Sequence, residues 1–246
     1  MDILAIAAVA FTIAGFVKGV VGFGFPVITL IILTLTIGLL DALAIIIIPT
    51  IVTNVWQGLS GPYLKDIVRR MWLYFLTAAI FVWFTSAYLT VLDVRWPTAM
   101  LGAVLFVFAL TRLLKVSIEL PRKWQQPLSI PLGAINGMLT GMTGSFMVPS
   151  VLYMQAIGFR RDLLVQAMGV FFALSTTVLA LSLGNNGLVS LDHMQLSLLA
   201  LVPSILGLYI GRWTRLKINE ERFQQIFLAA VLLLGAYISY KSVAGL

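Results

Sequence analysis

The sequence predicts an all-α integral membrane protein, with about ten hydrophobic elements arranged as two inverted five-element repeats. Three observations lead to this fold class. Apolar residues of the set AVILMFWYC make up 61% of the 246 residues and charged residues only 10%, against about 45–50% and about 25% in soluble domains. Apolar segments recur along the chain at about the 20-residue length of a membrane span. A glycine-rich motif occurs once in each half.

This composition excludes several classes of protein. A chain this apolar leaves no room for a separate soluble domain, so a soluble enzyme, a nucleic-acid-binding module and a disordered protein are all excluded. The sequence contains no cysteine and one histidine, His193, which excludes disulfides, thiolate metal sites and a histidine-rich metal site. No cofactor is expected. A membrane enzyme would need an intramembrane nucleophile, paired acids or metal ligands, and the sequence shows none.

Five elements of the first half lie between charged and turn residues. The chain begins without a basic n-region, so its start is interpreted as a membrane segment rather than a removed signal peptide. Glycines separate the first element from the second. Asp41 and Asp93 precede or open later elements, where a carboxylate stabilises a helix N-terminus. The predicted elements are residues 2–18, 24–38, 42–59, 71–91 and 96–114.

The second half follows the charged junction ELPRKWQQP near residue 120 and repeats this order. Glycines again separate the first two elements, and Asp162 and Asp192 stand near later helix starts. The Gly-linked pair that opens each half has short arms, so we expect two re-entrant hairpins with tips near the membrane midplane; the alternative is that each pair is one broken spanning helix. The predicted elements are residues 127–142, 146–158, 163–183, 190–211 and 223–243.

The glycine motif reveals an internal repeat. It reads GFVKGVVGFGFP from Gly15 to Pro26 and GMLTGMTGSFMVP from Gly137 to Pro149. The three aligned glycines are offset by 122 residues and the prolines by 123. Residues 1–120 and 121–246 therefore form two membrane repeats. Because each half has an odd number of elements, the two halves have opposite orientations in the membrane.

The distribution of basic residues predicts the orientation. Of the 16 Lys and Arg residues, 14 follow odd-numbered elements, and the even-numbered connections and termini contain only Arg95 and Lys241. The positive-inside rule then places the odd-numbered connections in the cytoplasm and both termini outside. The expected location is the plasma membrane, which in bacteria is the inner membrane. The connections expected in the cytoplasm are residues 61–70, 112–126, 160–162 and 212–222.

Two segments resemble a known family. AGFVKGVVGFGFPVITL and GAINGMLTGMTGSFMVPSVL each open one half, and they resemble the sulfite exporter TauE/SafE family, the 4-toluene sulfonate uptake permeases. The resemblance covers nearly the whole chain. It implies export or uptake of sulfite, sulfonates or related anions. The sequence departs from the family's richer glycine run at Phe23 and Phe25 in the first copy and at Ser145, Phe146 and Met147 in the second.

Lys18 is the principal candidate for binding a substrate. A cation at depth in the membrane is costly and tends to mark an ion pathway. Glycines on either side allow backbone N–H groups to face an anion. The alternative is that Lys18 extends to the cytoplasmic interface as an anchor. Thr140 stands at the equivalent position of the second half, so the site is expected to be asymmetric.

The remaining candidates are small or polar residues. Glycines of the motif either line the site or pack helices closely, and packing is favoured for Gly15–Gly19 and Gly137–Gly141. Uncharged polar side chains either bind oxyanion oxygens or tie helices together. Phe23, Phe25 and Phe146 are candidates for an apolar gate, with helix or lipid contact as the alternative. The predicted substrate-binding residues are Lys18, Gly19, Gly22, Gly24, Asn54, Gln57, Gly141, Thr143, Gly144, Ser145 and Gln166.

The acidic residues favour an anionic substrate by their placement. None lies in the middle of a predicted element, where a cation transporter normally has Asp or Glu. The leading hypothesis is a transporter that binds a small sulfur-containing anion between the hairpin tips and works by alternating access. The alternatives are an anion channel of the same fold, a permease for another small organic anion, and a non-catalytic scaffold. The expected partners are the anion and the lipid bilayer, and a homo-oligomer stays an alternative.

Overall fold

The structure, a computed structural model, describes residues 3–116 and 118–245. These ranges contain twelve α-helices, one short 3-10 helix and no strand, which confirms the all-α fold class. The helices of the first half are α1 (Ile3–Val21), α2 (Phe25–Ile37), α3 (Leu39–Ile45), α4 (Ile47–Leu59), α5 (Leu64–Ser86), η1 (Ala87–Thr90) and α6 (Arg95–Leu113). Those of the second half are α7 (Arg122–Thr143), α8 (Ser150–Ala156), α9 (Arg161–Asn185), α10 (Leu191–Leu199), α11 (Leu201–Arg215) and α12 (Glu220–Ala244).

Several helices are long and apolar enough to cross a membrane. The described residues contain 6 such segments, or up to 7 when α3 and α4 count as one bent span. The chain is therefore a multi-pass membrane protein. The first element is longer than expected, because Lys18 does not end α1, which continues to Val21 over 19 residues. By length and composition α1 is itself a candidate span, so the expectation of a short first arm is wrong.

Two predicted elements are broken by prolines. The third element consists of α3 and α4, which meet at Ile46 with a bend of 48°. Pro49 lies one turn beyond the break, and its ring displaces the carbonyl group four residues earlier. The ninth element is interrupted at Ala200, one turn before Pro203, but α10 and α11 together still form one candidate span, Leu191–Arg215. The bend at Ile46 lets the third element change direction as it crosses the protein.

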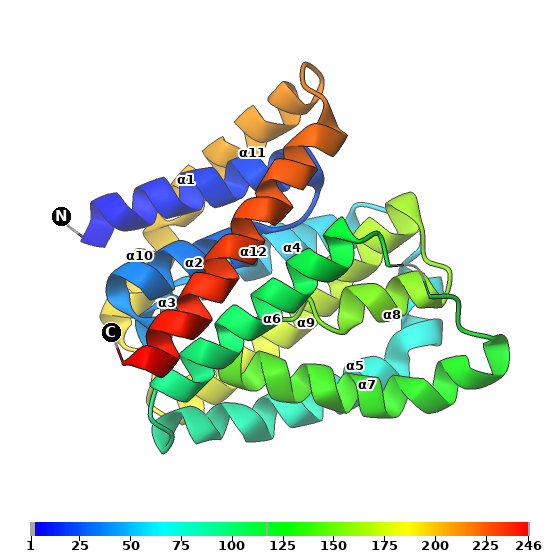
Figure 1. Cartoon of the computed structure of the whole chain (residues 1–246), viewed down its shortest axis with the longest axis horizontal. Coiled ribbons are helices and arrows are strands. Elements are labelled where there is room, and N and C mark those ends of the chain that lie inside the picture. The colour runs from blue at the N-terminus through cyan, green and yellow to red at the C-terminus, as the bar shows by residue number, and fades with distance from the viewer. Residues whose placement is uncertain (1–2, 117, 246) are drawn as a thin grey trace.

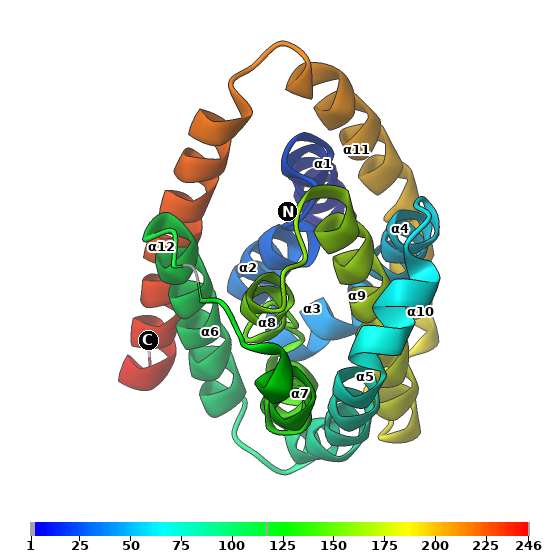
Figure 2. The ribbon, with the colours of Figure 1, turned by 90° about the vertical axis from the view of Figure 1, so that its right-hand side faces the viewer.

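The two halves pack on each other reciprocally. The first helix of each half lies along the fourth element of the other half, as α1 lies beside α11 and α7 beside α5. The third elements meet through α4 and α9, and the fifth through α6 and α12. Figure 2 shows α6 and α12 on one side and α4, α5 and α11 on the other, with α1, α2 and α8 between them. This pattern favours two related halves, and their inverted orientation stays a prediction.

Glycines make these contacts close. A Cβ atom added to Gly19 in α1 would lie 2.9 Å from the Cα atom of Gly211 in α11. A Cβ atom added to Gly141 in α7 would lie 2.9 Å from the backbone nitrogen of Ser86. Gly15 and Gly137 meet the backbones of the same two partner elements. The packing interpretation of Gly15–Gly19 and Gly137–Gly141 is thus confirmed, because any side chain there would separate the helices.

Candidate functional site

The turn between α1 and α2 forms the first hairpin tip. Gly22 and Gly24 have φ angles of 84° and 95°, a left-handed conformation that glycine adopts without a steric penalty. Pro26 stands in the first turn of α2, where its missing N–H group leaves no intrahelical bond unmade. The expected turn role of Gly22, Gly24 and Pro26 therefore agrees with the backbone geometry. The Cβ position of Gly24 faces the side chains of Phe227 and Val17.

Lys18 lies one turn before this tip and is buried, with 5% of its surface exposed. Its Nζ donates hydrogen bonds to Oδ1 of Asn54 at 2.6 Å and to Oγ1 of Thr53 at 3.2 Å. Both partners are neutral. Within the described ranges no Asp or Glu forms an ion pair with Lys18. The partners of the buried Lys18 amine are thus neutral, and no carboxylate of the described residues compensates a positive charge on it.

A cavity of about 420 Å³ opens beside Lys18, between α1, α4 and α11. Arg212 and Arg215 from the end of α11 contribute two more cations to its wall. Arg215 is paired with Glu220 at 2.9 Å, whereas Arg212 has no ion pair in the part of the chain described here. No acid lines the cavity among these residues. The other lining residues are Gly19, Gly22, Val52, Thr53, Trp56, Gln57, Val165, Ile205, Leu208 and Tyr209.

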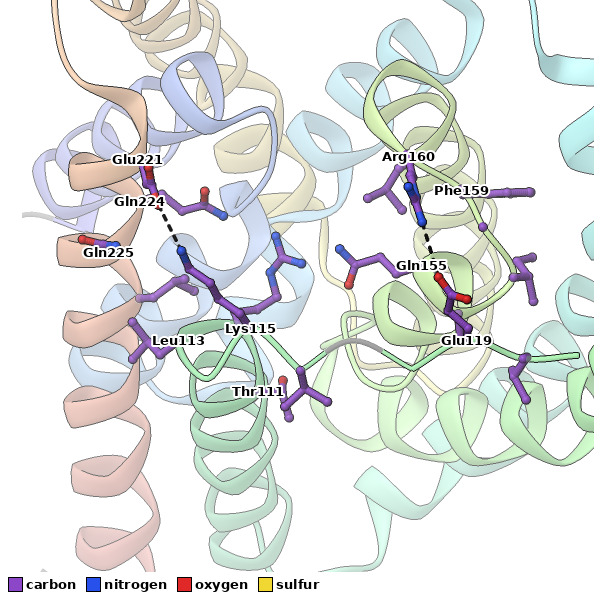
Figure 3. Close-up of a pocket in the computed structure, with 18 of the residues that line it drawn as sticks. Thr111, Leu113, Lys115, Glu119, Gln155, Phe159, Arg160, Glu221, Gln224 and Gln225 are labelled. Carbon is purple, nitrogen blue, oxygen red and sulfur yellow. Dashed lines mark hydrogen bonds and ion pairs between the residues drawn. The ribbon is translucent and has the colours of Figure 1, made fainter.

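A second cavity, of about 1020 Å³, lies between α6, α8 and α12. Two of its cations are neutralised. Figure 3 shows Lys115 paired with Glu221 on one wall and Arg160 with Glu119 on the other, at 3.2 Å and 3.5 Å. None of the predicted site residues lines this cavity. The smaller cavity is therefore the better candidate for binding an anion, although the other is more than twice as large.

Five of the predicted residues are brought together at the smaller cavity. Lys18, Gly19, Gly22 and Gln57 line it directly, and Asn54 holds the Lys18 ammonium group. The Nε2 atom of Gln57 donates to the carbonyl oxygen of Val165 at 2.8 Å. Gln57 thus connects α4 to α9 and also presents its amide to the cavity wall.

Gln166 lies elsewhere. Its Nε2 atom donates to the carbonyl oxygens of Gly58 at 2.9 Å and Gly61 at 2.8 Å, and its Oε1 atom accepts from the backbone nitrogen of Tyr63 at 3.0 Å. Both ends of the amide are used to fasten the connection between α4 and α5. This geometry favours the alternative interpretation of Gln166 as a tie between helices.

The second hairpin tip is a separate structure. Gly141, Thr143, Gly144 and Ser145 do not line the cavity beside Lys18. Gly144 ends α7 with a φ angle of 69°, and its Cβ position faces the side chain of Leu43. Asn136 closes this tip by donating from Nδ2 to the carbonyl oxygens of Val148 at 2.8 Å and Phe146 at 3.1 Å. Apart from Gln166, the predicted site residues therefore fall into two groups, one near each tip.

The three gate candidates pack inside the protein. Phe23 contacts Phe108 and Phe227, with ring centroids 6.2 Å and 6.3 Å away. The ring centroids of Phe146 and Phe172 are 4.9 Å apart. The ring centroid of Phe25 is 5.9 Å from Nζ of Lys18, a distance at which an aromatic face attracts a cation. None of the three lines the cavity, and their role as a gate stays a prediction.

Sequence reasoning missed part of the cavity wall. From the sequence, Arg212 and Arg215 belong only to the basic residues of a cytoplasmic connection, Trp56 belongs to an interfacial aromatic belt, and nothing singles out Thr53 or Tyr209. One signal was present. Gly207 and Gly211 in α11 repeat the G-x-x-x-G spacing of α1, and they contact its backbone. Because Gly211 touches Gly19, its neighbour Arg212 has to lie close to Lys18.

Membrane-spanning helices that enclose a basic cavity free of acids are typical of a membrane transporter. The family model for the sulfite exporter TauE/SafE matches residues 6–238. The chain therefore belongs to the TauE/SafE sulfite exporter family, a family of membrane transporters. No curated protein and no solved structure matches it.

Proposed function

We propose that this protein transports a small sulfur-containing anion, sulfite or an organosulfonate, and that Lys18 binds the anion. The buried amine of Lys18 with two neutral partners is the observation that carries the proposal. A buried charge without a counter-ion is unfavourable. An anion in the adjoining cavity supplies the missing charge each time the site is filled.

The chemistry of the cavity wall matches such a ligand. An ammonium group has three N–H donors, and Thr53 and Asn54 accept from Lys18 here. The remaining donor, the guanidinium group of Arg212 and the amide of Gln57 are available to sulfite or sulfonate oxygens. Trp56 and Tyr209 form an apolar part of the wall, which accommodates the organic group of a sulfonate. Sulfite alone fills a smaller part of the same space.

A difference between the halves supports alternating access. The cavity lies where α11 diverges from α4, and these two helices touch only weakly. The corresponding boundary between α5 and α9 is packed closely, and the hydroxyl oxygens of Ser86 and Ser182 lie 2.5 Å apart there. In transporters built from inverted repeats, two such boundaries open in turn. We infer that the present state is open on the side of Arg212, which we expect to be cytoplasmic.

Uptake into proteoliposomes tests the proposal. Sulfite, a small alkyl sulfonate, sulfate and acetate serve as labelled substrates. We expect saturable flux of sulfite or the sulfonate that is accelerated by the same anion on the opposite side of the membrane. An anion channel gives flux without this acceleration, and another permease favours acetate. Saturable transport of sodium or of a cationic amine, with no response to sulfite or sulfonates, contradicts the proposal.

A further inference from the structure

A third cavity, of about 650 Å³, lies between the first turns of α5 and α7, away from Lys18. Arg69 and Arg70 contribute to it from α5, and Arg122 contributes from the first residue of α7. Gln125, Gln126, Tyr153 and Ile157 complete its wall. Within the described ranges no Asp or Glu lines it, so three guanidinium groups surround one space.

The charges of this cavity are only partly accounted for. Arg70 donates from Nη2 to the carbonyl oxygen of Ile157, and its guanidinium carbon lies 4.6 Å from the ring centroid of Phe159. Arg69 and Arg122 form no ion pair in the described part of the chain. Asp66, one turn earlier in α5, also forms none. Arg69, Arg70 and Arg122 are exposed, so water screens their mutual repulsion, and an anion bound between them lowers it further.

The outer face of α5 indicates what kind of anion this is. Val68, Trp72, Leu76 and Ile80 are exposed and follow one another at intervals of one helix turn. In a membrane this stripe contacts acyl chains, so Arg69 lies at the level of the lipid headgroups. Trp124 is exposed beside Arg122, as is typical of an aromatic residue at the interface. Arg69 of the cavity directly follows Val68, the first residue of this stripe, in the chain.

We propose that this cavity binds the phosphate group of an anionic phospholipid, whose acyl chains lie along the α5 stripe. Guanidinium groups present paired N–H donors that match phosphate oxygens. Basic pockets between membrane helices on the cytoplasmic side bind such headgroups. The headgroup of a lipid contacts the arginines and its acyl chains contact the α5 stripe, whereas free phosphate contacts only the arginines. The site is separate from the transport cavity, and Lys18→Met is expected to leave it unchanged.

Lipid titration of the purified full chain in detergent tests this inference. The probes are phosphatidylglycerol, phosphatidylcholine and inorganic phosphate, with the thermal midpoint and retained lipid in native mass spectrometry as readouts. We expect only phosphatidylglycerol to raise the midpoint and to stay bound. Arg69→Gln combined with Arg122→Gln is expected to weaken its binding about tenfold or more, as the loss of charge-assisted hydrogen bonds does.

The matched control also removes two positive charges, one near the start of α5 and one near the start of α7. Lys65→Gln combined with Lys123→Gln affects two exposed cations that do not line the cavity, and it is expected to bind phosphatidylglycerol like the wild type. Equal weakening in both double variants overturns the site, because it indicates diffuse surface attraction. Equal stabilisation by inorganic phosphate overturns the lipid assignment. If the arginine pair does not fold, Arg69→Gln against Lys65→Gln gives the same comparison.

Discussion

The Nζ atom of Lys18 in α1 lies 2.6 Å from Oδ1 of Asn54 in α4, across 36 positions of the chain. This hydrogen bond joins the first hairpin to the bent third element. It also holds the ammonium group at the cavity wall without neutralising it, because an amide carries no charge. The arrangement leaves the positive charge for a ligand, and several of the following predictions depend on it.

Removing the charge of Lys18 is expected to weaken anion binding. Lys18→Met keeps most of the side-chain volume, and we expect the dissociation constant for sulfite to rise by about one to two orders of magnitude, at about 1.4 kcal/mol per tenfold. Lys18→Arg is expected to be intermediate, because a forked guanidinium differs in shape from an ammonium. Calorimetry on the purified variants measures this. An unchanged constant for Lys18→Met would show that the residue is only an anchor.

Placing a negative charge beside Lys18 is also expected to weaken anion binding. Asn54→Asp places a carboxylate where the amide oxygen now accepts from Lys18, so the resulting ion pair competes with the substrate anion. We expect sulfite affinity to fall by about tenfold or more. Thr53→Val removes a hydrogen-bond acceptor but adds no charge, and serves as the control with a smaller loss. Equal affinities of Asn54→Asp and wild type would contradict an electrostatic role for Lys18.

Locking the boundary between α5 and α9 distinguishes a transporter from a channel. The side-chain oxygens of Ser86 and Ser182 are 2.5 Å apart, so Ser86→Cys with Ser182→Cys is expected to form a disulfide on oxidation. The absence of native cysteine makes the experiment clean. We expect oxidation to stop transport of the alkyl sulfonate, reduction to restore it, and binding at Lys18 to persist throughout; sulfite is not used here, because it cleaves disulfides. Undiminished flux through the oxidised protein would favour a channel.

Packing glycines are expected to tolerate no side chain. Gly141→Ala places a Cβ atom 2.9 Å from the Ser86 nitrogen, and we expect it to lower the free energy of unfolding by about 1–3 kcal/mol. Gly184→Ala meets nothing within 4 Å and is expected to be neutral or stabilising by up to about 1 kcal/mol. Thermal unfolding of both variants provides the comparison. Lost sulfite binding in a fully stable Gly141→Ala protein would instead assign Gly141 to a binding site.

Single cysteines test the orientation. Asp66→Cys and Lys217→Cys lie in connections that the positive-inside rule places in the cytoplasm, and both positions are exposed. An impermeant maleimide added to intact cells is expected to label neither, and to label both after permeabilisation. The start of α1 and the end of α12 lie on the same side of the molecule (Figure 1), opposite to these connections in the proposed topology. Labelling of either position from outside would reverse the model.

Most helices of the fold can be predicted from the sequence, because hydropathy, charge and turn residues determine where a helix begins and ends from nearby residues alone. The predicted third and ninth elements correspond to pairs of helices whose breaks precede Pro49 and Pro203. The predicted first element ends at residue 18, whereas α1 continues to Val21. The reason is that a charged residue such as Lys18 usually ends an apolar segment. Asn54 and Gln166 looked equivalent as polar residues in apolar surroundings. Only their partners, Lys18 in one case and a backbone connection in the other, distinguish them.

Composition and local pattern are enough to predict a helical membrane protein, to place no acid in the middle of a predicted element, and to put a lysine before the first glycine tip. These are properties of composition and of residues near one another in the chain. The packing of the helices is needed to know that Arg212 shares a cavity with Lys18 and that the second tip does not. The physical reason is the contact between Gly19 and Gly211. This contact joins segments 192 positions apart in the chain. The packing of the whole bundle determines that the glycines of α1 pair with those of α11.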